Sequence, residues 1–462
     1  MTRAQHVAQW LHETLERRLD ELDIPAASVA VYVDGELVEH GAGVLNRGTG
    51  VENTVDGVFQ IGSITKVWTA TLVMQLVDEG IVALDEPVLT YLPEFSLEDA
   101  DAAAAVTVRQ LLTHTAGFEG DVFRDTGVGD DALEIFIRGI GDVPQLFTPG
   151  EQFSYNNLAF CVLGRLVEVL RGMPYDQALH QYVITPLGLT HAATDAAQAI
   201  RFRAALGHLD AGEGGPVVPA PIWAMQRSNS PAGSMLAMTA RDLIAFAAMH
   251  LRGGVAEDGT RVLSEASVEA MQVREVDLPR LEMLGDAWGL GWELMDTNIG
   301  TMIGHDGNTI GQASFLRVLP EHGIAVALLT NGGNVYPLSR EIFAHILGEL
   351  AGVEYKHLPT PPTDAEPIDA SRFVGTYGAS VMDLTVTQDA EQRIWIDIVP
   401  KGLAIELGET AQRSEYVPFG PDRIIAVEPT SGMFMPFVFI GADDDGNARY
   451  LHTGRAMPRV AG

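Results

Sequence analysis

Strand-like segments lie at both ends of the first part of the chain, and helical patterns fill the stretch between them. Near the N-terminus, the runs Ser28 to Val33 and Glu36 to Gly41 flank an Asp-Gly dipeptide that favours a tight hairpin turn. Strand-like runs return only at Ala313 to Leu319 and Gly323 to Leu329, after helical patterns and loops from about Asp85 to Asp286. This order predicts an α/β (α+β) fold, in which one antiparallel sheet is built from both ends, is flanked by helices and carries a helical insertion.

Three further segments have the periodicity of helices. Apolar residues recur at three- and four-residue steps from Val7 to Leu22, from Thr65 to Glu79 and near Leu338 to Leu350. The N-terminal pattern predicts an amphipathic helix and lacks the apolar core of a secretory signal. No apolar stretch is long enough to span a membrane. We therefore expect a cytoplasmic protein that does not enter membranes.

A proline-rich segment predicts a boundary between two domains. Residues Lys356 to Ala370 contain four prolines and no apolar periodicity, which is typical of a linker. We predict a first domain at 1–356, a linker at 357–370 and an all-β second domain at 371–462. The strand-like runs of the second domain are Phe373 to Tyr377, Leu384 to Thr387, Ile394 to Ile398, Ile424 to Val427 and Phe434 to Ile440. Strands and turns of this length predict a small barrel or sandwich.

The charge balance excludes two classes of partner. Acidic residues outnumber basic ones 62 to 29, which gives a formal net charge of -33, and no basic run interrupts the acidic composition. Such a field repels phosphate backbones and anionic lipid surfaces, so we expect no nucleic-acid or membrane partner. Only three of the basic residues are lysines, namely Lys66, Lys356 and Lys401. The single cysteine, Cys161, excludes an intramolecular disulfide and a cysteine-based zinc site.

One of the three lysines follows a serine at helical spacing. Ser63 and Lys66 stand at the start of the helix predicted over Thr65 to Glu79, and residues three apart share one face of a helix. A lysine that is partly desolvated there loses its proton more readily and can accept the proton of a serine hydroxyl. The pair therefore predicts an activated nucleophile, although a serine and a lysine at this spacing also occur together by chance.

Two other motifs contain residue types that serve catalysis or substrate binding. Tyr155 and Asn157 precede an apolar helical segment, where a phenol can relay a proton and an amide can bind a carbonyl or orient a lysine. His305 and Gly307 stand before the strand-like run at Ala313, where a glycine lets the backbone approach a ligand. Taken alone, each motif also fits a packing role.

Together the three motifs resemble those of a known superfamily. Ser63-x-x-Lys66, Tyr155-x-Asn157 and His305-x-Gly307 resemble the serine β-lactamase and penicillin-binding-protein superfamily, in its class C β-lactamase-like branch. That branch includes D-alanyl-D-alanine carboxypeptidases, D-aminopeptidases and esterases. The flanking segments Val106 to Gly117 and Pro231 to Leu243 fit as well, and the resemblance covers about residues 5 to 350. It implies a β-lactamase/transpeptidase-like first domain.

The resemblance implies roles for the first two motifs. Ser63 would be the nucleophile that accepts the acyl group, and Lys66 would activate it. Tyr155 would be a general base that activates water for deacylation, and Asn157 would contact the substrate amide and Lys66. Whether Lys66 or Tyr155 takes the serine proton is left open. His114 matches a family position outside the catalytic motifs and is interpreted as structural.

The third motif would bind the substrate. His305 stands where class C β-lactamases usually have lysine and where the carboxypeptidases and peptidases of the branch more often have histidine, which favours a peptidase over a β-lactamase. Gly307 would keep the strand open, and the backbone N–H groups of Ser63 and Asn308 would form the oxyanion hole. In the surrounding negative field, a carboxylate substrate would need a local cation. His305 when protonated, or an arginine folded in from elsewhere, would provide it.

The resemblance predicts a serine hydrolase that forms an acyl-enzyme on an ester, an amide or a short D-peptide, with no cofactor and no metal. Acyl transfer to an amine or alcohol is one alternative, and a non-catalytic module that binds β-lactam-like or acylated ligands is another. The second domain resembles a lipocalin-like appendage, opening at Phe373 to Tyr377. It would either pack over the rim of the active site and limit substrate size, or mediate a homo-oligomer.

Overall fold

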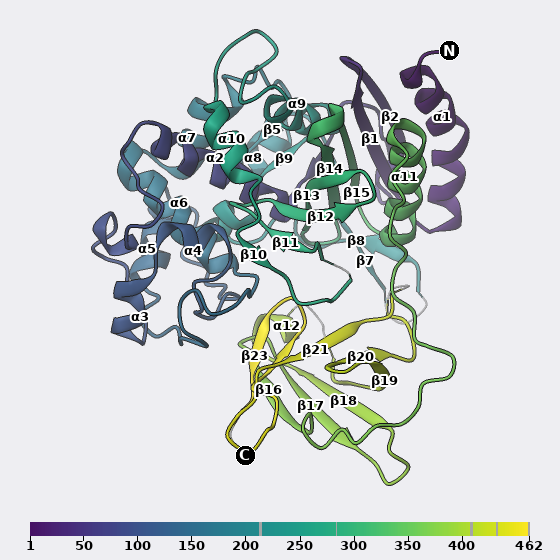
Figure 1. Ribbon diagram of the computed structural model, residues 1–462. Coiled ribbons are helices and arrows are strands. Elements are labelled where there is room, and N and C mark those ends of the chain that lie inside the picture. Colours follow the sequence, from purple (N-terminus) through teal and green to yellow (C-terminus); the bar gives the residue numbers. More distant parts are fainter. Residues whose placement is uncertain (212–214, 283, 407–409, 431–432, 461–462) are drawn as a thin grey trace.

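The protein is built around one large antiparallel sheet. The computed structural model describes residues 1–462 except 212–214, 283, 407–409, 431–432 and 461–462. The sheet contains β1 (Ala26–Val33), β2 (Glu36–Asn46), β3 (Val51–Glu52), β10 (Val276–Asp277), β11 (Ala287–Trp288), β12 (Glu293–Thr297), β13 (Gly300–Asn308), β14 (Ala313–Leu319) and β15 (Ile324–Thr330). Their spatial order is β10-β11-β12-β13-β14-β15-β1-β2-β3 (Figure 1). The predicted fold class is confirmed.

The two ends of the first part of the chain meet in the middle of this sheet. β1 pairs antiparallel with β15, so that Ala27 lies opposite Thr330, and it pairs with β2 on its other side. The faces of β1 alternate between two cores. Val29 and Val31 pack into a core beneath α1 (Arg3–Glu21) and α11 (Val335–Ala351), which cover the outer face (Figure 1). Ala30 belongs to the larger core, which is shared with the helical part.

The helical part is inserted between β4 and the last strands of the sheet. Its α-helices are α2 (Thr65–Asp78), α3 (Ala100–Ala105), α4 (Val108–Leu112), α5 (Ala132–Arg138), α6 (Asn157–Arg171), α7 (Tyr175–Leu179), α8 (Ala196–Ala199), α9 (Ala240–Leu251) and α10 (Glu265–Met271). Its other helical turns are η1 (Gly62–Ile64), η2 (Val88–Thr90), η3 (His180–Ile184) and η4 (Arg227–Ala232), and η5 (Pro320–His322) follows β14. α2 is buried from Thr65 to Gln75, which places it at the centre of the larger core.

Two small sheets complete this part. One contains β5 (Ala192–Ala193), β9 (Ala237–Met238), β4 (Gly57–Gln60) and β6 (Arg203–Ala204), in that spatial order. The other is the hairpin of β7 (His208–Asp210) and β8 (Val217–Pro219). β4 leads directly into η1 and α2, so this small sheet fixes the start of the buried helix.

The C-terminal barrel is an eight-stranded antiparallel meander. Its strands are β16 (Gly375–Gly378), β17 (Met382–Gln388), β18 (Ile394–Pro400), β19 (Gln412–Gly420), β20 (Arg423–Ala426), β21 (Pro436–Ile440), β22 (Tyr450–His452) and β23 (Ala456–Pro458), with α12 (Leu403–Glu406) between β18 and β19. A bridge between Tyr377 and Arg459 brings the last strand back to the first and nearly closes the barrel. It encloses its own apolar core and lies below the main body in Figure 1. The predicted all-β C-terminal part is confirmed.

The structure corrects the predicted position of the strands before Ala313. The sequence predicted that strands return only there, but β10, β11, β12 and β13 precede it and lie in the same sheet. Three glycines and several polar residues in Gly300–Asn308 hide the strand from a pattern based on apolar alternation. In the barrel, β19, β22 and β23 were also missed.

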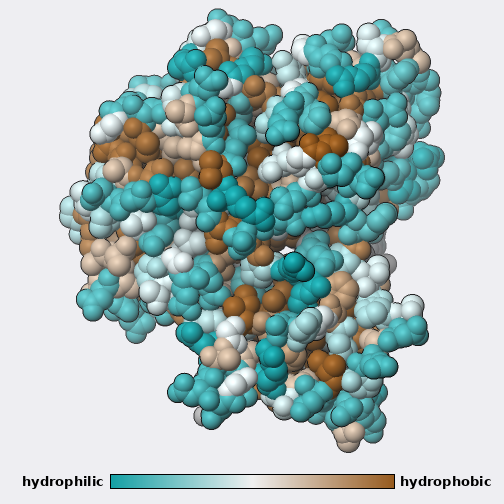
Figure 2. All heavy atoms as spheres, in the orientation of Figure 1, coloured by the Kyte–Doolittle hydropathy of each residue, from teal (hydrophilic) through white to brown (hydrophobic). Residues whose placement is uncertain are grey.

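The predicted domain boundaries stay a prediction. The stretch from 352 to 374 is fully described, and it connects α11 to β16 through turns and irregular backbone without a helix or strand. Most of the face seen in Figure 2 is hydrophilic, with scattered hydrophobic residues. Within the described parts of the chain, no helix is both long enough and apolar enough to cross a membrane.

Candidate active site

Ser63 and Lys66 lie together at the start of the buried helix. Ser63 belongs to η1 and Lys66 to the first turn of α2, so the three-residue spacing places both side chains on one face. Lys66 Nζ lies 3.1 Å from Ser63 Oγ. The Lys66 side chain is fully buried, although a lysine is among the residues least often found inside a protein.

Two oxygen atoms accept hydrogen bonds from the Lys66 amine. Nζ donates to Asn157 Oδ1 and to the carbonyl oxygen of Ala232, both at 2.7 Å. Burial lowers the pKa of Lys66 from its usual value to about 7, because the charged form loses its hydration. Near neutral pH a large share of the amine is therefore unprotonated. A neutral amine has two N–H donors, which these two oxygens occupy, and its lone pair is left for Ser63.

Tyr155 is held over Lys66 by a buried histidine. Its ring centroid lies 4.8 Å from Lys66 Nζ, and its ring stacks on His114 at 4.5 Å. His114 Nδ1 accepts a hydrogen bond of 2.9 Å from the backbone N–H of Asn156, and Asn156 in turn caps α6 through a 2.7 Å bond to Ala159 N. Burial raises the pKa of Tyr155 well above its usual value, so the phenol keeps its proton.

Asn157 connects the lysine to a carboxylate. Its Oδ1 faces Lys66, and its Nδ2 donates to Asp121 Oδ1 at 2.7 Å. Asp121 is itself buried, in the loop that follows α4. The sequence singled out Asn157 but gave no signal for Asp121, because a lone aspartate in a loop has no distinguishing pattern.

The end of β13 packs directly against the nucleophile's turn. A Cβ on Gly307 would lie 2.0 Å from the carbonyl oxygen of Ile61, and a Cβ on Gly62 would lie 2.6 Å from the backbone nitrogen of Asn308. Gly62 also has a positive φ of 51°, a conformation that favours glycine. The absence of side chains at both positions lets the backbone of Asn308 approach the residue next to Ser63.

His305 lines the site as a neutral imidazole. Its Nδ1 donates to the carbonyl oxygen of Asp306 at 2.6 Å, so the other ring nitrogen carries the lone pair. That nitrogen, Nε2, is buried and has no hydrogen-bond partner among the described residues. Burial lowers the pKa of His305 to about 3, because the imidazolium would lose its hydration. The interpretation of His305 as a cation for a carboxylate substrate is therefore wrong near neutral pH.

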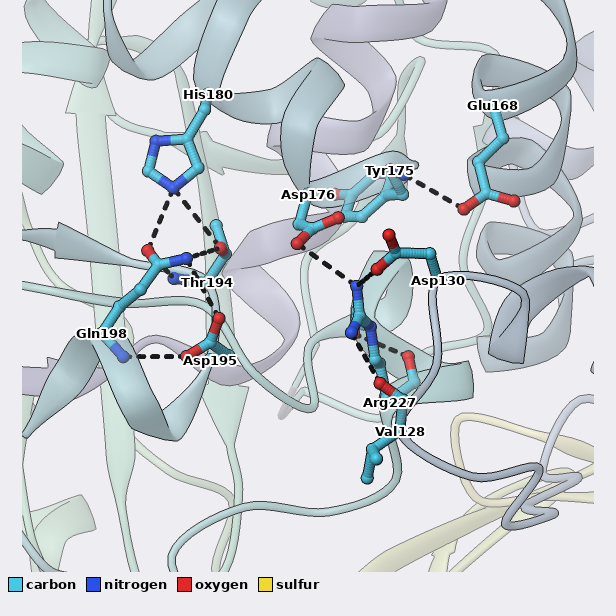
Figure 3. Close-up of polar contacts among 11 residues, drawn as sticks. Val128, Asp130, Glu168, Tyr175, Asp176, His180, Thr194, Asp195, Gln198 and Arg227 are labelled. Atoms are coloured by element: carbon cyan, nitrogen blue, oxygen red, sulfur yellow. Dashed lines mark hydrogen bonds and ion pairs between the residues drawn. The ribbon is translucent and has the colours of Figure 1, made fainter. Parts of the chain in front are cut away.

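η4 supplies the second acceptor for Lys66 at its last residue, and side-chain contacts of its first residue hold it in place. Ala232 ends this turn, and the following Gly233 packs against Gly62, because a Cβ there would lie 2.3 Å from the Gly62 carbonyl oxygen. Arg227 begins the turn and donates to Asp130 at 2.8 Å and to the Val128 carbonyl oxygen at 2.7 Å (Figure 3). These contacts fix the turn whose last carbonyl oxygen faces Lys66.

The C-terminal barrel also reaches the site. The turn between β22 and β23, residues 453–455, lies beside the loop of Tyr155, and the carbonyl oxygen of Gly454 accepts from Tyr155 N at 3.0 Å. Arg455 places its guanidinium 5.1 Å from the Tyr155 ring centroid and forms an ion pair with Asp121. The sequence predicted an arginine as a cation for a substrate carboxylate, and Arg455 does not have that role here because it is paired with Asp121.

These residues open onto a cleft of about 530 Å³. Ser63, Tyr155, Asn157, His305 and Asn308 line it on one side. Apolar side chains cover much of the remainder, namely Phe123, Leu209, Met225, Leu284, Trp288 and Ile310. Among the described residues, no group of three His, Cys, Asp or Glu side chains is arranged to hold a metal ion. All seven residues singled out from the sequence thus lie in one region of the structure.

Comparisons with known proteins identify the family of the chain. The profile of the Beta-lactamase family matches residues 11–348. Penicillin-binding protein 4 of Amycolatopsis lactamdurans is 46% identical over 373 residues, which cover 80% of this chain and 97% of that protein. The crystal structure of SurE superposes with a TM-score of 0.78 at 28% identity and covers 99% of both chains. D-amino acid amidase from Ochrobactrum anthropi SV3 shares the fold, with a TM-score of 0.63 at 23% identity over 75% of this chain and 98% of that one.

Proposed function

The chain belongs to the Beta-lactamase family, and from this premise we propose that it hydrolyses a small ester or amide through an acyl-enzyme on Ser63. The observation that carries the proposal is the buried amine of Lys66, which lies 3.1 Å from the serine oxygen and has a pKa of about 7. A lysine with a pKa near the working pH is suited to accept the proton of a nucleophile. The other residues of the site support this role for Lys66.

In the acylation step, Ser63 Oγ attacks the carbonyl carbon of the substrate while its proton moves to the neutral Lys66 amine. Lys66 is the better acceptor, since the pKa of Tyr155 is held high by burial and its phenol is already protonated. The oxyanion would accept hydrogen bonds from the backbone N–H groups of Ser63 and Asn308. The leaving group then departs with the proton that Lys66 received.

In the deacylation step, a water molecule attacks the acyl carbonyl carbon. Tyr155 and Ser63 line the same cleft. The Tyr155 phenol would give its proton to the departing Ser63 oxygen as it accepts one from the attacking water. Tyr155 then acts as the base for water without becoming a lasting phenolate, which its burial disfavours. The products are a carboxylic acid and free Ser63.

The lining of the cleft favours a neutral substrate with an apolar acyl group. His305 is neutral near pH 7, because burial lowers its pKa to about 3, and it therefore provides no positive charge for a substrate carboxylate. Arg455 is already paired with Asp121 and is not a free cation for a carboxylate. We therefore expect neutral esters and amides to react faster than acidic ones.

The rate of acylation is expected to rise with pH. Below pH 7 the Lys66 ammonium has no lone pair, and above it the neutral amine accepts the serine proton, so the midpoint should lie near 7. His305, with a pKa of about 3, adds no inflection in this range. Single-turnover acylation by p-nitrophenyl acetate, from about pH 5 to about pH 9, measures the profile. A rate that does not change across neutral pH would contradict the role given to Lys66.

The proposed function is tested by detecting the acyl-enzyme directly. The wild-type protein and Ser63→Ala are exposed to a panel of esters, D-aminoacyl amides and β-lactams, and intact mass is recorded at short times. We expect an adduct on Ser63 with at least one class and none in the variant. Product analysis with and without an added amine then separates hydrolysis from acyl transfer. The absence of an adduct across the panel, with no turnover, would favour the non-catalytic binding module.

A further inference from the structure

A buried carboxylate connects the main body of the molecule to the C-terminal barrel, next to the candidate active site. Asp121 Oδ1 accepts from Asn157 Nδ2 at 2.7 Å and from Arg455 Nη2 at 3.2 Å. Asn157 comes from the first turn of α6, whereas Arg455 comes from the β22–β23 turn of the barrel. Asp121 is 8% exposed, so its charge requires a partner inside the protein. Arg455 is that partner.

The carboxylate fixes which way the Asn157 amide points. A carboxylate only accepts hydrogen bonds, so the NH₂ end of the amide must face Asp121. The oxygen end is then directed at Lys66, from which it accepts at 2.7 Å. A protonated or missing carboxylate would let the amide turn over and present N–H groups to the lysine, which would remove one of the two acceptors that orient its amine.

Other contacts hold the same segments in place. Ser380, in the barrel, donates from its backbone N–H to Glu119 at 2.9 Å and from its hydroxyl to the Asp121 carbonyl oxygen at 2.9 Å. His452 Nε2 donates to the Phe153 carbonyl oxygen at 2.8 Å, and its Nδ1 accepts from Gly454 N, which fixes the tautomer of this buried ring. The barrel thus forms hydrogen bonds with the loop that carries Asp121 and with the loop that leads to Tyr155.

We propose that the C-terminal barrel is part of the catalytic apparatus, and that Arg455 acts through Asp121 as a positioning residue for the Asn157 amide and the Lys66 amine. This inference rests on the proposed function for its catalytic meaning, but the geometry of the chain of contacts is independent of the substrate. Arg455 is not assigned to the substrate, because its charge is compensated by Asp121 and by the neighbouring Glu119.

The other groups that face Lys66 are uncharged near neutral pH. Burial raises the pKa of the Cys161 thiol on α6 to about 12 and raises that of the Tyr155 phenol. Burial also lowers the pKa of His305 to about 3 and the pKa of His114 well below its usual value. The ion pair of Asp121 and Arg455 therefore provides the charges that act on Lys66, the carboxylate raising its pKa and the guanidinium lowering it.

Asp121 and Arg455 have opposite effects on the pKa of Lys66, so the proposal can be tested without a substrate. The chain has only three lysines, so the protein labelled with ¹³C at lysine Cε gives three signals, and Lys356→Arg and Lys401→Arg assign two of them. Titration of the third signal reports the pKa of Lys66. It is measured in the wild type, Arg455→Met, Asp121→Asn, the double variant and Arg455→Lys. Acylation rates of the same variants are measured in parallel.

We expect Arg455→Met to raise the pKa of Lys66 by roughly 0.5 or more and Asp121→Asn to lower it, with the double variant returning toward the wild type. Acylation of Arg455→Met near pH 7 should fall roughly tenfold, and Arg455→Lys should recover most of the loss. Arg423→Met is the matched control, because Arg423 crosses the same interface to Glu282 at 2.7 Å but does not contact the site. It should behave as the wild type in both measurements.

Three results would overturn the proposal. The first is a Lys66 titration that does not change in either variant, or that moves in the same direction in both, while thermal unfolding shows that the variants are folded. The second is an equal loss of activity in Arg423→Met, which would indicate general loosening of the interface. The third is a rise in KM confined to acidic esters, which would make Arg455 a substrate carboxylate site. If wild-type Ser63 forms no adduct, the proposed function fails, but the titration still decides whether the pair sets the pKa of Lys66.

Discussion

Replacing Lys66 by alanine should reduce the rate of acylation nearly as much as replacing Ser63 does, by roughly 10³-fold or more in each case. The two side chains act as one unit, since the serine oxygen is a weak nucleophile until the amine 3.1 Å away takes its proton. The double variant should therefore be no slower than either single variant. Single-turnover acylation of the three proteins by one activated ester measures this non-additivity.

Lys66→Arg provides a sharper version of the same test. An arginine keeps the positive charge but does not give up its proton near neutral pH, so it should not restore acylation. The chain offers matched controls in its other two lysines, which are partly exposed and pair with Asp286 and Asp383. Lys356→Arg and Lys401→Arg should leave the rate unchanged. Substantial activity in Lys66→Arg would show that another group takes the serine proton.

Gly307→Ala should lower acylation by roughly 10²-fold or more. The added Cβ would lie 2.0 Å from the Ile61 carbonyl oxygen and 2.6 Å from Ser314 Oγ, so the end of β13 must move away from the turn that carries Ser63. The backbone N–H of Asn308 moves with it, and the oxyanion loses one of its two donors. The acylation rate of the variant measures the loss of the oxyanion donor. The midpoint of its thermal unfolding measures the cost in stability of moving the end of β13.

Gly348→Ala is the control for this substitution. Gly348 lies within α11, has an ordinary helical backbone, and a Cβ there would meet only the Val353 carbonyl oxygen at a normal contact distance of 3.6 Å. Alanine is the better helix former, so this variant should be as stable as the wild type or slightly more stable, with unchanged acylation. A wild-type rate in Gly307→Ala would mean that the strand end does not supply an oxyanion donor.

Local spacing explains which parts of the site could be predicted from the sequence. Ser63 and Lys66 are three residues apart on a helix, and their proximity follows from helix geometry once the helix is recognised. Tyr155 and Asn157 stand at a helix start for a similar local reason. The resemblance to a known superfamily then linked these motifs across long stretches of chain, which no periodicity could have done.

The residues that sequence reasoning missed act across long distances and lie in weakly patterned segments. Asp121 is one of many acidic residues in loops, and Arg455 lies in a turn between two three-residue strands that were not predicted. β13 escaped detection because its glycines, which the site requires, also weaken the strand pattern. The predicted arginine was a cation for a substrate carboxylate, whereas Arg455 pairs with Asp121, and no sequence pattern indicated this pair.

The pairing of β1 with β15 has a consequence for synthesis on the ribosome. Ala27 is synthesised early, and its partner Thr330 is synthesised much later. Until β15 is synthesised, the edge of β1 that pairs with it has no partner strand. Contacts between residues so distant in sequence form slowly, and such edges promote association between nascent chains. We expect recombinant production to be limited by this interval, so that slower translation at low temperature, or added chaperones, should raise the yield of folded protein.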